Sequence, residues 1–200
     1  MTATVAPRPP LGLPAGSIRG LLALQIAVIF WLLLLAPRDI TIPLNLYFLL
    51  SLVMMFFVAH GKSIARRDEK TASPLWLPGG TLRLLLLAGT AAVLIYVYVN
   101  HPERLDRLTP KQEQLANWRY YLAALGIGFV LGYGTRLLPF RHAWGFQAFQ
   151  AWIAILAMAV LFLEAVFQAI INWSLTEQLD PVAWQTIVTG TAAFYYGSRS

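Results

Sequence analysis

Tyr196-Gly197-Ser198-Arg199 closes the last of six apolar segments in this chain, and two close variants end the second and the fourth segment. The variants are His60-Gly61-Lys62-Ser63 and Tyr133-Gly134-Thr135-Arg136. Two units also open alike, with Leu13-Pro14-Ala15-Gly16-Ser17-Ile18-Arg19 and Leu77-Pro78-Gly79-Gly80-Thr81-Leu82-Arg83. Because motifs that recur at a long period are typical of repeat architectures, the sequence predicts three tandem units of two segments each.

The composition places these units in a membrane. The 200 residues are 58% hydrophobic and 12% charged, whereas soluble domains are roughly half apolar and about a quarter charged. We therefore predict an all-α polytopic integral membrane protein. The chain contains no cysteine, which excludes disulfides, thiolate metal sites and iron–sulfur clusters.

Six transmembrane helices are predicted, paired as three parallel helical hairpins in one membrane domain, residues 1–200. A spanning helix needs about 17–25 residues. The first four segments fit, the fifth must tilt or project beyond the bilayer, and the sixth is short. The predicted spans are Ile18–Ala36, Pro43–His60, Leu82–Val99, Arg119–Leu138, Ala143–Trp173 and Val182–Gly197. A Pro-rich cytoplasmic segment, residues 1–16, precedes hairpins at 17–67, 77–138 and 140–200.

Basic residues near the span ends predict the orientation, because cytoplasmic loops carry an excess of Lys and Arg. One side holds Arg8, Arg19, Lys62, Arg66, Arg67, Lys70, Arg83, Arg136, Arg141 and Arg199, and the other holds Arg38, Arg104, Arg107, Lys111 and Arg119. We therefore expect a multi-pass protein of the cell (inner) membrane with both termini in the cytoplasm. Its longest outer loop, Asn100–Asn117, is expected to carry a short surface helix.

The basic residues of the repeated motifs are predicted to contact anionic lipid head groups on the cytoplasmic side. They are Arg19, Lys62, Arg83, Arg136 and Arg199. Ser17 and Thr81 are expected to cap their helices, and the motif glycines to turn the chain at a helix end. A pocket for an anionic head group or acidic partner is the alternative use of these ends. The net charge of +6 does not predict nucleic-acid binding, because no basic run is long enough to follow a phosphate backbone.

No metal, cofactor or catalytic site is predicted. His60 occupies the position of Tyr133 and Tyr196 in the other units, so we interpret it as an aromatic ring at the membrane interface. His142 lies on the same side, but two histidines without carboxylate or cysteine support are a weak metal signal. Metalloprotease, nucleophile-elbow and nucleotide-loop motifs are missing from the sequence, which argues against an enzyme.

The strongest chemical signal is a polar stripe on the fifth span. Glu164 lies inside an apolar run, where a charged side chain costs several kcal/mol, or about 3 on insertion scales. At 100° per residue it shares one helical face with other polar side chains. The stripe consists of Gln147, Gln150, Glu164, Gln168 and Asn172, and its candidate partners are Gln25 and Asn45.

Small residues at four-residue spacing predict close helix packing on three spans. These ridges are Ala88 and Ala92, then Ala124, Gly128 and Gly132, and finally Ala193 and Gly197.

The stripe has three candidate uses: hydrogen bonding between helices of one chain or of neighbouring subunits, a path for protons, ions or a small solute, and docking of a basic partner subunit. We favour hydrogen bonding, because a single intramembrane acid is thin support for transport. The sequence therefore predicts a non-catalytic structural or accessory subunit that organises a membrane protein assembly, through self-association or other membrane subunits. The alternative is a channel or transporter centred on Glu164, and a lipid-active enzyme ranks third.

Overall fold

The computed structural model describes residues 14, 16–36, 40–59, 75, 77, 80–139, 144–172 and 181–199, and within these the fold is all-helical. Six long helices match the predicted segments closely. They are α1 (Ser17–Leu35), α2 (Leu44–Ala59), α3 (Thr81–Asn100), α5 (Trp118–Gly134), α6 (Trp144–Val166) and α7 (Val182–Arg199). The short elements are η5 (Pro102–Leu108), α4 (Gln112–Leu115), η6 (Thr135–Leu137) and η7 (Phe167–Ile171), of which η7 is π-helical and the other η elements are 3-10 helices. The predicted loop Asn100–Asn117 does carry short helices, as expected.

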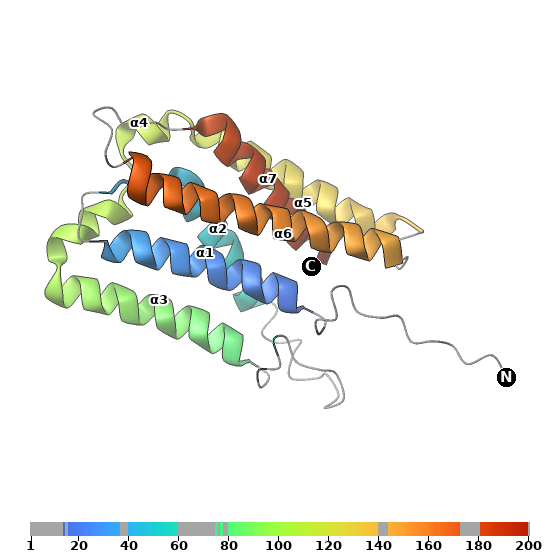
Figure 1. Cartoon of the computed structure of the whole chain (residues 1–200), viewed down its shortest axis with the longest axis horizontal. Coiled ribbons are helices and arrows are strands. Elements are labelled where there is room, and N and C mark those ends of the chain that lie inside the picture. The colour runs from blue at the N-terminus through green and yellow to red at the C-terminus, as the bar shows by residue number, and fades with distance from the viewer. Residues whose placement is uncertain are drawn as a thin grey trace.

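The long helices lie side by side, and consecutive ones run in opposite directions (Figure 1). α1, α3 and α6 run one way, and α2, α5 and α7 run the other way. The start of α1 therefore meets the end of α7, where Arg19 Nη1 donates to the Arg199 carbonyl oxygen at 3.2 Å. We call this the terminal end of the bundle, and the opposite end, where η5 and α4 lie, the loop end.

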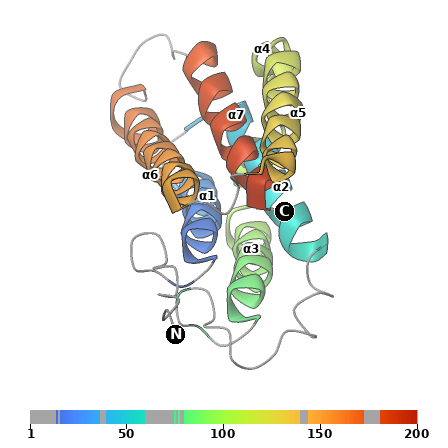
Figure 2. The same ribbon diagram turned by 90° about the vertical axis from the view of Figure 1, so that its right-hand side faces the viewer.

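α1 forms the centre of the bundle and contacts α2, α3 and α6 (Figure 2). Leu22, Ile26 and Leu34 on this helix have no exposed surface. α1 is hydrophobic on all sides, as expected for a helix surrounded by other helices. Its interface with α3 is close, because a Cβ on Gly89 would lie 2.6 Å from the Trp31 ring.

Three described helices are long and apolar enough to cross a membrane: Ser17–Leu35, Thr81–Asn100 and Gly145–Ile171. The apolar helix Leu44–Val58 is shorter. Burial differs greatly among the three, from 56% for α1 to 28% for α6 and 17% for α3. The composition thus supports a membrane protein.

The most extensive helix contact joins α5 and α7. A Cβ built on Gly128 would lie 2.2 Å from the Gly190 carbonyl oxygen, and one on Gly132 would lie 2.0 Å from the Phe194 carbonyl oxygen. On α7, a Cβ on Gly197 would approach the Phe129 carbonyl oxygen to 2.2 Å. The predicted packing ridges of the fourth and sixth spans are therefore confirmed. Ala88 and Ala92 instead lie on the exposed side of α3.

The close contact between α5 and α7 differs from the predicted pairing of helices. α1 contacts α2, and α6 contacts α7, but α3 packs against α1 and η5 whereas α5 packs against α7 and α2. The second predicted hairpin, 77–138, is therefore not a closely packed pair. The physical reason is complementarity, because the glycines of α5 fit the backbone of α7 and Gly89 of α3 fits Trp31.

The opening motif repeats in conformation. Gly16 and Gly80 both occupy the N-cap position in the left-handed region, with φ of 87° and 90°. This region strains residues that carry a Cβ, so glycine is the residue of choice. The prediction that Ser17 and Thr81 are N-caps is wrong, since each begins its helix. The Ser17 hydroxyl accepts a hydrogen bond from the Leu75 N–H at 2.8 Å instead.

The glycines of the closing motif do not turn the chain, and the two described copies of the motif have different surroundings. Gly134 keeps a helical φ of −59°, and α7 continues through Gly197 to Arg199, so neither glycine turns the chain. Tyr133 is 52% exposed, whereas Tyr196 is fully buried and packs against the Phe56 ring. The two rings that correspond to His60 therefore have different surroundings, one on the surface and one inside the bundle. His60-Gly61-Lys62-Ser63 lies outside the described residues.

Candidate functional site

The predicted polar stripe divides into two groups along α6. Gln150, near the helix start, is buried, and Gln147 is half-buried. The other three residues, Glu164, Gln168 and Asn172, are 4%, 5% and 3% exposed. About 21 Å of helix separates Gln150 from Glu164 at 1.5 Å per residue. The stripe therefore faces the interior of the bundle mainly at the loop end, and it is not one continuous site.

Asn45 holds Glu164 within the bundle. Its Nδ2 atom, on the first turn of α2, donates to both carboxylate oxygens of Glu164 on α6, at 3.2 and 3.1 Å. Both side chains are buried. Asn45 is thus confirmed as the partner that the sequence suggested. This contact therefore joins the first turn of α2 to α6.

The other suggested partner, Gln25, does not reach Glu164. Its Nε2 atom donates to the Met158 carbonyl oxygen at 2.7 Å. Met158 precedes Glu164 by about 9 Å along α6, because each residue advances the helix about 1.5 Å. Gln25 therefore joins α1 to α6 at a different level.

A π-helical turn, η7, begins three residues after Glu164. Gln168 belongs to this turn, and Asn172 Nδ2 donates to its Oε1 atom at 2.7 Å. π-helical turns are rare and occur frequently at functional sites. Glu164, Gln168 and Asn172 are all buried, so the polar face of α6 continues inside the bundle through this turn.

Sequence reasoning missed a second buried polar pair, Tyr121 and Gln185. The Tyr121 hydroxyl on α5 donates to Gln185 Oε1 on α7 at 2.5 Å, and neither residue has exposed surface. A weak signal existed, because Gln185 and Thr189 are polar residues one turn apart on the sixth span. No regular pattern marked Tyr121, whose ring lies 6.3 Å from that of Phe48 on α2.

These pairs form what we call the polar cluster. α2, α5 and α7 begin at the loop end, and α6 ends there, so the cluster gathers at that end of four helices (Figure 1). Its hydrogen bonds join α2 to α6 and α5 to α7. The members are Asn45, Tyr121, Glu164, Gln168, Asn172 and Gln185.

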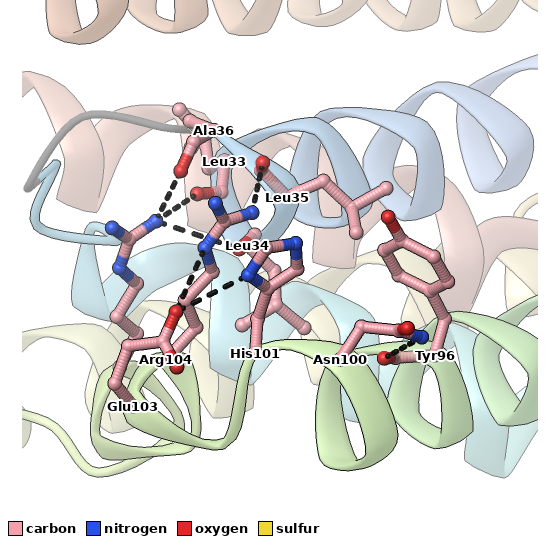
Figure 3. Close-up of polar contacts among 10 residues, drawn as sticks. Leu33, Leu34, Leu35, Ala36, Tyr96, Asn100, His101, Glu103 and Arg104 are labelled. Carbon is pink, nitrogen blue, oxygen red and sulfur yellow. Dashed lines mark hydrogen bonds and ion pairs between the residues drawn. The ribbon is translucent and has the colours of Figure 1, made fainter.

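Two arginines of η5 cap the last turn of α1 (Figure 3). Arg104 Nη1 donates to the Leu35 carbonyl oxygen at 2.7 Å, and Arg107 Nη1 donates to that of Ala36 at 2.8 Å. Arg107 also approaches the carbonyl oxygens of Leu33 and Leu34, each at 3.4 Å. The last carbonyls of a helix lack partners within it, and the negative end of its dipole attracts cations. The sequence assigned these arginines only to the outer side and missed this role.

An acidic residue borders the cap. Glu103 lies 3.2 Å from His101 Nδ1 and 3.9 Å from Arg104 Nε. The carboxylate of Glu103 accepts a hydrogen bond from the backbone N–H of the same residue. This bond, together with the contacts to His101 and Arg104, holds the pKa of Glu103 below its ordinary value of 4.5. At a pH above its ordinary pKa, the ionised carboxylate of Glu103 therefore stabilises the folded state. This stabilisation is lost as the pH falls through the lowered pKa.

A cavity of about 490 Å³ opens beside the cap. η5 forms one wall, with Thr41, Tyr47 and Lys111 on the others. Its volume is within the range of small-molecule sites, roughly 300–1,000 Å³. The Tyr47 hydroxyl donates to the Arg107 carbonyl oxygen, so the cavity wall is tied to the cap. Glu164 is not among the lining residues, and the cavity is separate from the polar cluster.

The predicted head-group contacts have different surroundings. Besides its contact with Arg199, Arg19 places its guanidinium carbon 4.6 Å from the centre of the Phe56 ring. Arg136 is exposed and stacks over Tyr133 at 5.2 Å. Arg83 and Arg199 are half-buried. Lys62 lies outside the described residues.

No group of three or more His, Asp or Glu side chains that could hold a metal ion occurs in the described part of the chain. His60 and His142 fall outside it. Comparison with known proteins gives no match to a family model, a curated protein or a solved structure.

Proposed function

We propose that this protein is a non-catalytic, multi-pass protein of the cell membrane that serves as a structural or accessory subunit of a membrane assembly. In this proposal all six long helices cross the bilayer and both termini are cytoplasmic. The support is geometric. α2, α5 and α7 lie alongside the three helices of spanning length and composition (Figure 1). A lipid bilayer that encloses those three helices would therefore also enclose the other three.

The observation that carries the proposal is the exposure of α3. This helix has the length and hydropathy of a span, yet only 17% of it is buried. Leu84, Ile95 and Val99 are 68%, 63% and 67% exposed. Soluble proteins rarely expose such large apolar patches, and larger ones mark membrane or protein contacts. Ala88 and Ala92 lie on the same exposed side, where small residues allow a neighbouring helix to approach.

The polar cluster supports a structural role for the stripe. Glu164, the residue that most favoured transport, receives hydrogen bonds from Asn45 of its own chain and is 4% exposed. Hydrogen bonds between membrane helices contribute roughly 0.6–2 kcal/mol each. The cluster therefore holds the bundle together, and the outer face of α3 is left for lipid and neighbouring subunits.

Site-specific cross-linking tests the proposal. Because the chain has no cysteine, Ala92→Cys introduces a single thiol on the exposed side of α3. We expect a thiol cross-linker applied to native membranes to join this variant to a second polypeptide. The matched control is Ile187→Cys on α7, which is 66% exposed but outside the proposed contact. Equal or absent adducts at both positions would overturn the subunit proposal.

Transport through the polar cluster is the second candidate, favoured by the π-helical turn beside a buried acid. Proteoliposomes that contain the wild-type protein or Glu164→Gln distinguish the two functions. Under the structural proposal neither protein supports proton or cation flux, and the variant assembles normally because glutamine still forms hydrogen bonds. Flux by the wild type that the variant lacks would establish transport in its place.

A further inference from the structure

Two polar atoms within the polar cluster have no hydrogen-bond partner among the described residues. They are Asn45 Oδ1 and Gln185 Nε2. Neither side chain has exposed surface. Buried polar atoms in proteins are nearly always paired, with another protein group or with ordered water. The two atoms are also complementary, since one accepts a hydrogen bond and the other donates one.

The register of α2 and α7 places these two side chains opposite each other. The two helices are in contact and run in the same direction (Figure 1). Phe56 and Tyr196 face each other across this contact, with ring centres 5.4 Å apart. Asn45 precedes Phe56 by the same number of residues as Gln185 precedes Tyr196. That interval is about three turns of helix, which returns each side chain to nearly the same face.

The third helix gives the same placement independently. Tyr121 on α5 donates its hydroxyl to Gln185, and its ring lies 6.3 Å from that of Phe48. Phe48 follows Asn45 by three residues on α2, so the two share a helical face. Tyr121 therefore contacts Gln185 and lies near the side of α2 that carries Asn45, which agrees with the placement given by α2 and α7.

We propose that an ordered water molecule is bound between these two side chains, donating to Asn45 Oδ1 and accepting from Gln185 Nε2. A cation would satisfy only the asparagine oxygen, and an anion would satisfy only the glutamine nitrogen. A neutral molecule that both donates and accepts satisfies the two. If the Gln185 amide were reversed, so that its nitrogen faced Tyr121, water would still fit by donating to both amide oxygens.

The bound water completes a hydrogen-bonded chain across four helices. Buried waters typically make about three hydrogen bonds to otherwise unpaired groups and are costly to remove. The two separate pairs of the cluster thereby become one network. Its order is Glu164 on α6, Asn45 on α2, water, Gln185 on α7 and Tyr121 on α5. This site does not depend on the proposed function, because a structural bundle and a transporter could each contain it.

A structure of the protein in lipid nanodiscs, at a resolution that shows ordered water, tests the site directly. We expect a solvent peak within hydrogen-bond distance of both Asn45 Oδ1 and Gln185 Nε2. A direct hydrogen bond between the two amides would overturn the proposal. So would another side chain between them, or a peak with the short ligand distances of a metal ion.

A double-mutant cycle gives a second measurement. Asn45→Leu and Gln185→Met each remove one side of the water site, and each should lower the melting temperature in detergent. The double variant should lose less stability than the sum of the two single losses, because either change already displaces the water, whereas the Asn45–Glu164 and Tyr121–Gln185 hydrogen bonds are lost separately. Additive effects would overturn the proposal. The control pairs Asn45→Leu with Thr191→Val, a half-buried threonine whose hydroxyl donates to the Ile187 carbonyl oxygen of its own helix, and this pair should be additive.

Discussion

At the scale of single residues, the glycines of α5 differ by position rather than by chemistry. Gly128 meets the backbone of Gly190 on α7, whereas a Cβ on Gly126, two residues earlier, would meet nothing within 4 Å. The backbone of α7 cannot move aside as a flexible side chain could. The close approach of α5 and α7 therefore depends on Gly128 and not on a general glycine content.

Gly128→Ala should consequently destabilise the bundle. Its Cβ would lie 2.2 Å from the Gly190 carbonyl oxygen, and such overpacking typically costs about 1–3 kcal/mol. Gly126→Ala should instead be neutral or stabilising by about 0.5–1 kcal/mol, because alanine favours the helix. Unfolding in graded detergent mixtures measures both free energies. Equal stability of the two variants would mean that α5 and α7 do not approach as closely as described.

Glu164 and Gln185 show what could and could not be predicted from single residues. An acid within an apolar run is conspicuous, and Asn45 was found as its partner because few polar residues lie in the other spans. Gln185 was overlooked because glutamine and threonine together made the sixth segment resemble a weak span. Tyr121 was hidden among other aromatic residues, and only the crossing of α5 and α7 brings its hydroxyl to Gln185.

At the scale of elements, similar motifs in the sequence have different structural meanings. The opening motif repeats in conformation because Gly16 and Gly80 meet a backbone requirement, a left-handed N-cap. The closing motif repeats in sequence, but its glycines have different surroundings. Gly197 serves close packing, and Gly134 has open space around it. The sequence therefore predicted the helices, their alternating directions and the small-residue ridges of α5 and α7, but not that these two helices pack against each other.

Helix ends in this bundle are capped by arginines from other elements. Arg104 and Arg107 of η5 bind the last carbonyls of α1, and Arg19 of α1 binds that of Arg199 on α7. Each pairing places a cation at the negative end of a helix dipole. Charge counting had treated Arg104 and Arg107 only as markers of orientation, and Arg19 also as a lipid head-group contact. Their contacts show that they also fix how neighbouring elements meet.

Arg107→Gln should test the capping role. The substitution removes a charged donor from the Ala36 carbonyl oxygen, and hydrogen bonds to charged groups contribute about 1.5–3 kcal/mol. We expect a loss of stability in that range, measured by the same unfolding titration, together with faster amide exchange in the last turn of α1. Arg119→Gln, an exposed residue near the start of α5, should change stability by less than about 0.5 kcal/mol. Unchanged exchange at Leu33–Leu35 would show that Arg107 does not cap the helix.

At the scale of the whole molecule, burial is concentrated on one side. α1 is surrounded by other helices, whereas α3 covers it as an edge helix with most of its apolar surface outward (Figure 2). The loop end carries the arginine cap, the cavity and the polar cluster. At the terminal end, the start of α1 meets the end of α7. Such unequal ends and sides are expected of a bundle with one face toward each aqueous compartment and an outer surface toward lipid.

Cysteine labelling tests this orientation, because every introduced thiol is the only one in the chain. Thr109→Cys lies exposed at the loop end, and Arg136→Cys lies exposed at the terminal end. Maleimides react with thiols that water can reach, since the thiolate is the nucleophile. In intact cells or spheroplasts, a membrane-impermeant maleimide should label Thr109→Cys at once and Arg136→Cys only after permeabilisation. Val53→Cys, fully buried on α2, should stay unlabelled in both conditions. Labelling of both exposed positions from outside would contradict the spanning arrangement, and the reverse order would place the termini outside the cytoplasm.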